Sequence, residues 1–371
     1  MLTEFFSQPQ AECFRSVADK VHLEYAEKGT FFLEKAFIQD LDAELSVFPR
    51  ILPELLLAAE AVKADQNAAE YALFVYRAME NRSLFKEHIA LFRFPKNHVF
   101  IPLLCLLPTI RKTYLFLRDK NIPKDILKTT LGQYEACVFV YSKRYDRLGL
   151  NKRYFDWLQH YVDCEILDID RLRFEIKQLE DPVSLIEERI TGKRFLLYHD
   201  PQGLPDHEID YGVEGRRISA DGEICSETEF YPKDRYQLLI CPGDQCLGVH
   251  IPDEGDFSET TCENSYERAK RVFASCFPEF DFKGFHCKSW MMAPQLKQYL
   301  KPGSNILSFS GKFLKYPLPS KNEDVLNFVF LLKFTSYDDL PEDTSLQRSL
   351  KKLYQSGGKL YDYGGLRYIS G

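Results

Sequence analysis

This sequence lacks two features that would each indicate a common class of protein: a surplus of positive charge and a long apolar run. The chain of 371 residues carries 48 Lys and Arg against 55 Asp and Glu, a formal net charge of -7. Nucleic-acid binding needs a basic face, so we expect no nucleic-acid partner. The most apolar window, residues 99–117, is too short between its prolines and charges to cross a bilayer, so we expect no membrane partner.

The cysteines and the first residues both suit a cytoplasmic protein. Residues 1–10 include Glu4 and have neither a basic nor an apolar segment, which predicts no secretory signal. The ten cysteines are scattered singly, as expected for reduced thiols in apolar surroundings. Cys241, Cys246 and Cys262 do not have the paired spacing of zinc ligands, so we predict no metal.

Two further clusters are poorly arranged for chemistry. Adjacent ligands diverge in an extended chain, so Asp206-His207-Glu208 is interpreted as a solvated turn. His286 and Cys287 are neighbours in an expected strand and would point to opposite faces, which disfavours a Cys–His hydrolase. No spacing in the chain places two carboxylates across a cleft, as a glycosidase would need.

The chain length predicts two domains, at roughly 150 residues per domain. Residues 1–150 have helical spacing of apolar residues, with helices expected from Pro53, across 99–117 and over 124–144. The basic stretch 144–153 is the expected linker. From residue 171 the apolar period changes to two, and strands are predicted at 171–176, 194–198 and 236–240. We therefore expect an α+β protein, with an all-helical domain over 1–150 and a mixed-sheet α/β domain over 151–371.

A strand–helix–strand unit is predicted in the second domain. Residues 246–251 form a short apolar run, and an amphipathic helix follows Ser258, with Thr260 and Glu263 at capping-box spacing. Residues 282–287 alternate as a strand does, and a short helical piece is expected over 294–300. Near the end, Thr344 begins a helix that Gly357 closes, and the aromatic stretch 361–369 is expected to add an edge or rim element.

These residues carry a resemblance to a known family. The runs His250-Ile251-Pro252, Phe285-His286-Cys287-Lys288-Ser289-Trp290, Pro294-Gln295-Leu296 and Ser304-Asn305-Ile306, with the tail Asp339-Leu340-Pro341 to Arg348, resemble bacterial proteins called acyltransferase domain-containing. Members of this family pair a helical N-terminal domain with a C-terminal domain similar to the GNAT N-acyltransferases. The resemblance implies an acyl-CoA co-substrate, acetyl-CoA or a longer acyl-CoA, with no tightly bound cofactor, and a small-molecule amine as acceptor.

The loop where GNAT enzymes hold the CoA diphosphate departs from their pattern. Those enzymes use a Gln/Arg-x-x-Gly-x-Gly/Ala loop, whose backbone amides bind the phosphates. Here residues 252–259 contain one glycine, Gly255, and four carboxylates. The acidic residues either complement the dipole of the following helix or change the use of the site.

The resemblance implies roles for three catalytic residues. His250 lies at the end of the strand that lines the acyl site in GNAT folds and is the candidate general base, although a histidine there can also be structural. Glu254 is the second candidate base, or a solvated loop carboxylate. Tyr299 lies on the element where GNAT enzymes carry the tyrosine that protonates the departing thiolate, or it is a core residue with its hydroxyl at the rim.

Six further residues are expected to contact the acyl donor: Ile251, Gly255, Ser258, Arg268, Trp290 and Asn305. Trp290 and Asn305 are also ordinary core and turn residues. Two functions stay open. The first is an N-acyltransferase that moves an acyl group from acyl-CoA to an amine. The second is a non-catalytic ligand- or protein-binding protein on a degenerate GNAT-like scaffold.

Overall fold

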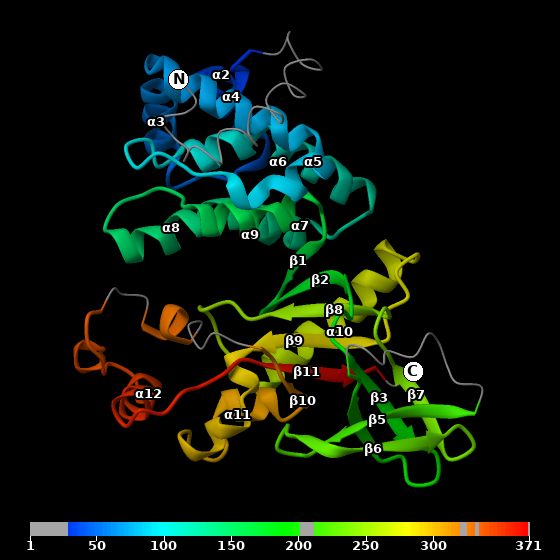
Figure 1. The fold of residues 1–371 in the computed structure, drawn as a ribbon. Helices are drawn as coiled ribbons and strands as arrows, with labels where there is room; N and C mark the ends of the chain where they lie inside the picture. Colours follow the sequence, from blue (N-terminus) through cyan, green and yellow to red (C-terminus); the bar gives the residue numbers. More distant parts are fainter. Residues whose placement is uncertain (1–28, 201–210, 320–324, 331–333, 370–371) are drawn as a thin grey trace. The chain divides into compact units, whose positions relative to one another are not determined.

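The computed structural model describes residues 29–200, 211–319, 325–330 and 334–369. The segments 1–28 and 201–210, which hold the first residues and the Asp206-His207-Glu208 cluster discussed above, lie outside these ranges. The chain forms two compact units that divide between Leu167 and Asp168 (Figure 1). The domain limits expected from the sequence, 1–150 and 151–371, stay a prediction that limited proteolysis would test.

Up to Val162, the secondary structure of the first unit is helical in the part that the structure describes. Its α-helices are α2 (Lys35–Leu45), α3 (Leu52–Ala64), α4 (Gln66–Glu80), α5 (Arg82–His88), α6 (Ile101–Asp119), α7 (Lys124–Leu131), α8 (Gln133–Tyr145) and α9 (Lys152–Val162). Asp65, Asn81 and Asn151 cap α4, α5 and α9 by accepting hydrogen bonds from backbone amides in the first turn. Packing of buried aromatic and aliphatic side chains between these helices forms one continuous core.

One helix expected from the sequence is two. The apolar stripe over 124–144 predicts a single helix, but α7 ends at Leu131 and α8 begins at Gln133. Gly132 lies between them and is the residue with the lowest helix propensity after proline. The prediction of one helix was wrong because a stripe of apolar residues continues across such a break.

The second unit is built on two sheets. The six-stranded sheet has the order β1 (Ile166–Ile169), β2 (Leu172–Gln178), β8 (Gln245–His250), β9 (Gly284–Ser289), β11 (Tyr363–Tyr368) and β10 (Leu314–Pro317). The five-stranded sheet has the order β6 (Ile224–Pro232), β5 (Gly212–Ile218), β4 (Arg194–Tyr198), β3 (Val183–Glu188) and β7 (Tyr236–Ile240). The remaining α-helices of this unit are α10 (Glu259–Cys276), α11 (Asn305–Ser310) and α12 (Ser345–Gln355).

The predicted strand–helix–strand unit is confirmed as β8, α10 and β9. The two strands run parallel, with Gly248 opposite His286 in the register. Helix α10 covers one face of the six-stranded sheet through its buried stripe, since the Tyr266 ring lies 5.7 Å from Phe174 on β2 and 4.6 Å from Phe285 on β9. On the other face, an apolar cluster that includes Cys246, Tyr316 and Leu366 joins this sheet to the five-stranded one.

The C-terminal strand is not the edge or rim element expected from the sequence. Strand β11 lies inside the six-stranded sheet, hydrogen-bonded to β9 on one side and β10 on the other. Its two glycines allow this position: a Cβ on Gly364 would overlap the ring of Tyr316, and one on Gly365 would come within 2.9 Å of Phe313. An aromatic stretch at the end of a chain indicates a strand but not its neighbours.

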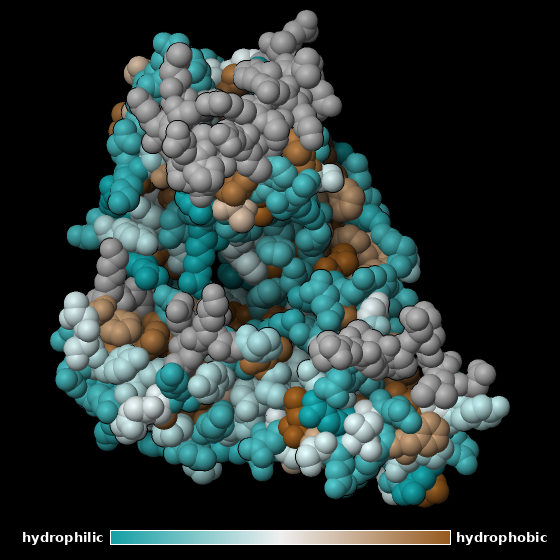
Figure 2. All heavy atoms as spheres, viewed as in Figure 1, coloured by the Kyte–Doolittle hydropathy of each residue, from teal (hydrophilic) through white to brown (hydrophobic). Residues whose placement is uncertain are grey.

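Hydrophilic residues predominate on the face of the described chain that Figure 2 shows, and apolar residues appear there as separate small areas. Within the described ranges, every helix is too short or too polar to span a membrane.

Candidate active site

A histidine and a glutamate meet on the sheet face that α10 does not cover. Strands β2 and β8 are antiparallel, with Glu175 opposite Gly248 and Arg173 opposite His250. Residues two apart in a strand share a face, so His250 and Glu175 are diagonal neighbours. The Nε2 atom of His250 lies 2.8 Å from Oε2 of Glu175. The register of two strands therefore brings together residues that are 75 positions apart in the sequence.

Gly248 leaves space for this pair because it has no side chain. A Cβ at that position would lie 3.2 Å from Oε2 of Glu175 and 2.6 Å from Cδ of Lys177. The side chains of both residues therefore extend over the bare backbone of Gly248. Lys177 places its Nζ 3.7 Å from the same oxygen that His250 contacts, which adds positive charge beside the carboxylate.

The pair fixes which ring nitrogen of His250 can act as a base. An ionised carboxylate only accepts hydrogen bonds, so Nε2 carries the hydrogen that is donated to Glu175. In the neutral imidazole, Nδ1 is then the nitrogen that can take a proton. Glu175 is buried, whereas 33% of the His250 side chain is exposed, so a reactant can reach the histidine. A carboxylate behind an accessible imidazole is the arrangement of a general base with an orienting partner.

The acidic loop after β8 caps helix α10 with its own side chains. Asp256 accepts hydrogen bonds from the Ser258 amide at 3.0 Å, from the Ser258 hydroxyl at 2.7 Å and from the Thr261 hydroxyl at 2.6 Å. The hydrogen bond from Thr261 and those from Ser258 lower the pKa of Asp256. The N-cap is Ser258, so the capping box expected between Thr260 and Glu263 is absent here. Glu263 instead forms a two-point ion pair with Arg367.

The other residues predicted to form the site are distributed around this strand–helix unit. Ile251 follows the end of β8, and Glu254 and Gly255 are exposed in the acidic loop, where Gly255 has a φ of +96° that favours glycine. Arg268 lies on α10 and pairs with Asp170.

Three more of these residues lie after β9. Trp290 is buried in the 3-10 helix η4 (Trp290–Met292), and Tyr299 follows η5 (Pro294–Gln298) with a partly exposed side chain. Asn305 is exposed at the start of α11, whose N-cap is Ser304. The roles of Tyr299 and Asn305 stay predictions.

Sequence reasoning missed Glu175, and it also missed Arg171, which lies in the turn between β1 and β2. The signal for Glu175 was present: a lone carboxylate in an otherwise apolar and basic strand, Leu172–Gln178. The pairing of Glu175 with His250 depends on the register between β2 and β8, which cannot be predicted from the sequence alone.

A second polar cluster lies further along the sheet. The Tyr316 hydroxyl and Nε2 of His286 are 2.6 Å apart, and Lys288 donates to Asp181 at 2.8 Å. Burial lowers the pKa of His286 despite the nearby carboxylate of Asp181. Burial also raises the pKa of the neighbouring Cys287 thiol to about 12, so Cys287 is not a thiolate nucleophile at neutral pH.

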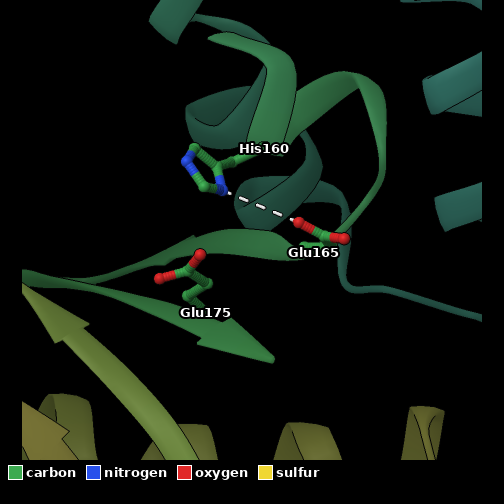
Figure 3. Close-up of side chains that lie close together, drawn as sticks. All are labelled: His160, Glu165 and Glu175. Atoms are coloured by element: carbon green, nitrogen blue, oxygen red, sulfur yellow. Dashed lines mark ion pairs between the residues drawn. The ribbon is translucent and has the colours of Figure 1, made fainter. Parts of the chain in front are cut away.

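Figure 3 draws three side chains with metal-binding atoms: His160, Glu165 and Glu175. His160 and Glu165 belong to the first unit, where the histidine Nδ1 lies 3.6 Å from a glutamate oxygen. Glu175 belongs to the second unit and is the partner of His250. We assign no metal to this group.

The mixed sheet, its parallel pair of β8 and β9 and the crossover helix α10 between them are the arrangement of a GNAT-like fold. The model of the family described as GNAT-like C-terminal domain matches residues 166–367, and the chain belongs to that family. Among curated proteins, the search found no match.

Solved structures share the fold over nearly the whole chain. One is an acyltransferase mutant in complex with octanoyl-CoA, with a TM-score of 0.63 and 18% identity, covering 90% of this chain and 87% of that one. A second is an acyltransferase in complex with CoA and 10C-teicoplanin, with a TM-score of 0.60, 19% identity and the same coverage. A third is an acyltransferase in complex with decanoyl-CoA and teicoplanin, with a TM-score of 0.59 and 19% identity, again covering 90% and 87%. At these identities the likeness concerns the fold.

Proposed function

We propose that this protein is an acyl-CoA-dependent N-acyltransferase that transfers an acyl group to a small-molecule amine in the cytoplasm. The observation that carries the proposal is the His250–Glu175 pair, because it is an oriented, accessible base at the end of the strand beside the crossover helix. Membership of the GNAT-like family and the acyl-CoA complexes named for the similar folds support the donor class.

The proposed reaction uses His250 and Tyr299 in succession. His250 takes a proton from the ammonium or amine of the acceptor on Nδ1, with Glu175 holding the ring and stabilising the imidazolium. The amine nitrogen forms a bond to the thioester carbonyl carbon as the bond from that carbon to sulfur breaks. Tyr299 gives its proton to the departing thiolate and regains one from solvent. Glu254 is the alternative base, but it is exposed in the loop.

The fit of the donor at the acidic loop is mixed. The first amide before α10 is already bonded to Asp256, and Asp253, Glu254 and Glu259 are exposed there, which disfavours phosphates. Arg171 lies beneath the loop, and two of its buried nitrogens have no partner among the described residues. Its positive charge favours the binding of phosphates nearby. The residues of the chain that would hold a CoA donor are therefore Arg171 together with the predicted set of Ile251, Gly255, Ser258, Arg268, Trp290 and Asn305.

The test is acyl transfer measured as release of the CoA thiol. Acetyl-, octanoyl- and decanoyl-CoA are offered with a panel of primary amines to the full chain and to His250→Ala. We expect His250→Ala to lower turnover by about 10²- to 10⁴-fold, the usual contribution of a general base. Glu187→Gln, a change on strand β3 of the other sheet, is the control. Equal turnover by His250→Ala and the wild type contradicts the assignment of the base.

The self-capped helix favours a second candidate, a non-catalytic binding protein on this scaffold. Measuring the thermal unfolding midpoint with and without each acyl-CoA distinguishes the two functions. A ligand that binds the native state raises this midpoint by mass action. A dose-dependent rise of the unfolding midpoint contradicts a binding protein that has no CoA site. An unchanged midpoint with every acyl-CoA contradicts the acyltransferase.

A further inference from the structure

Lys315 is a half-buried lysine on β10, the strand at one edge of the six-stranded sheet. Neighbours in a strand point to opposite faces, so Lys315 points away from Tyr316 and its polar cluster. It lies opposite Gly365 of β11 in the register. Buried Phe313 and Met292 cover this face at the glycine, where a Cβ would lie 2.9 Å from the phenylalanine Cβ and 3.1 Å from the methionine sulfur. Lys315 therefore extends over an apolar side of the sheet.

The amine of Lys315 has a hydroxyl as its partner instead of a carboxylate. Its Nζ donates to Oγ of the buried Ser310 at 3.2 Å, and it forms no ion pair with any residue that the structure describes. By comparison, Nζ of Lys312 in the same segment lies 2.5 Å from a carboxylate oxygen of Glu259. Lys297 on η5 adds a like charge near Lys315. The charged form of Lys315 is therefore destabilised by burial and by a neighbouring cation, with no carboxylate to compensate.

These surroundings make Lys315 a nucleophile near neutral pH. Burial and the charge of Lys297 lower the pKa of Lys315 to about 8, from an ordinary value of 10.5. At pH 7.5 about a quarter of such amines are neutral, against about one in a thousand ordinary lysines. Ser310 accepts one hydrogen of the neutral amine, which leaves the lone pair of Nζ available to a reactant at the exposed part of the side chain. Desolvation and a neighbouring cation are two ways in which proteins activate lysine as a nucleophile.

We infer that Lys315 is an acylation site of this protein, where the amine takes an acyl group from an acyl thioester. Nζ forms a bond to the thioester carbonyl carbon, the bond from that carbon to sulfur breaks, and the thiolate leaves while Nζ gives a proton to solvent. The product is a neutral amide, so a positive charge next to Lys297 is removed. This reaction goes beyond the proposed function, since it needs an acyl thioester but neither the His250 base nor an external amine.

The experiment measures acetylation of the full wild-type chain by acetyl-CoA, site by site, with peptide mass spectrometry from about pH 6.5 to 9.5. Lys312 is the internal control, because it is exposed in the same segment but has a carboxylate partner. At pH 7.5 we expect Lys315 to react at least about tenfold faster than Lys312, since its larger neutral fraction outweighs its lower basicity. The rate at Lys315 should level off between about pH 8 and 9, whereas the rate at Lys312 should keep rising. Equal rates at pH 7.5, or a rate at Lys315 that does not level off, overturn the inference.

The acetyl ester of N-hydroxysuccinimide tests whether a thioester reaches the amine. Selective reaction of Lys315 with this small ester but not with acetyl-CoA overturns the inference. The inference and the proposed function also fail separately. Acyl transfer to an external amine without preferential acetylation of Lys315 contradicts the inference and leaves the function standing. Preferential acetylation of Lys315 in both the wild type and His250→Ala, without transfer to any amine, supports the inference and contradicts the function.

Discussion

Tyr316 donates its hydroxyl proton to the carboxylate of Asp181 at 2.7 Å, across 135 positions of sequence. Asp181 lies in the connection from β2 to β3, and Tyr316 lies on β10, so this bond joins the linker between the two sheets to an edge strand. Although burial raises the pKa of Asp181, the hydrogen bonds from His286, Lys288 and Tyr316 together lower it well below its usual value.

The Tyr316→Phe variant should lower the free energy of unfolding by about 1–3 kcal/mol, the cost of leaving buried polar groups without their partner. Urea unfolding at neutral pH measures this, with Tyr361→Phe, an exposed tyrosine, as control. A difference of less than about 0.5 kcal/mol from the control would mean that Asp181 and His286 find other partners.

Stability should fall as the pH drops below about 6.5, the ordinary pKa of histidine. His199 is buried, with Nε2 2.7 Å from the Ser184 hydroxyl and Nδ1 3.1 Å from the Glu214 carbonyl, and burial lowers its pKa. The unfolded chain therefore binds more protons than the folded one between the lowered pKa and 6.5, so the free energy of unfolding rises with pH there. Urea midpoints from pH 7.5 to 5 test this; His199→Gln should reduce the slope, and an unaltered slope contradicts the assignment.

Glu175→Gln should change the pH dependence of turnover as well as its size. Losing the carboxylate removes the charge that stabilises the imidazolium of His250, so the apparent pKa of the base in the pH–rate profile should fall. In a double-mutant cycle, Glu175→Gln should have little effect once His250 is alanine. Independent effects of the two changes would show that Glu175 does not act through His250.

Gly248→Ala should lower turnover more than it lowers stability. The new methyl would meet Lys177 at the far end of a flexible side chain, which can move, but it would also press on the Glu175 carboxylate. A displaced Glu175 no longer holds the His250 ring, and small misplacements of catalytic groups are costly. Turnover and the urea midpoint are measured together, with Gly192→Ala, in open surroundings at a φ of +67°, as a control for glycine replacement alone. Wild-type turnover in Gly248→Ala contradicts this prediction.

Tyr299→Phe tests the proposed acid. The side chain is partly exposed after η5, so loss of its hydroxyl should change the unfolding free energy by less than about 0.5 kcal/mol. Turnover should fall, and it should fall less for thioesters with an acidic leaving thiol, because those need no proton from the enzyme. An equal fall in turnover for every leaving thiol would show that Tyr299 is not the acid.

Local patterns were enough to predict the elements of the strand–helix–strand unit. The apolar run in β8 and the stripe through Tyr266 on α10 are properties of a few neighbouring residues, and both were confirmed. The fold class followed from the change of period near residue 171 and from the family resemblance. The interior place of β11 did not follow, because it depends on which strands pair, and the close approach of Tyr316 to Gly364 is visible only in three dimensions.

The candidate site was predicted in part for the same reason. His250 was selected by its place at a strand end, which local sequence indicates. Glu175 and Arg171 were missed because one depends on strand register and the other on a turn beneath a distant loop. Residues that act in pairs across the chain cannot be recognised from either member alone.

Strands β2 and β8 are hydrogen-bonded neighbours, with Gln178 paired to Gln245 in the register, yet the whole five-stranded sheet lies between them in the sequence. That sheet is therefore an insertion at the tip of a hairpin. Its ends are one strand spacing apart, so a short turn could replace it without breaking the connection of the larger sheet. Within this fold, the inserted sheet is a module that evolution or an engineer could exchange while the strands carrying Glu175 and His250 keep their register.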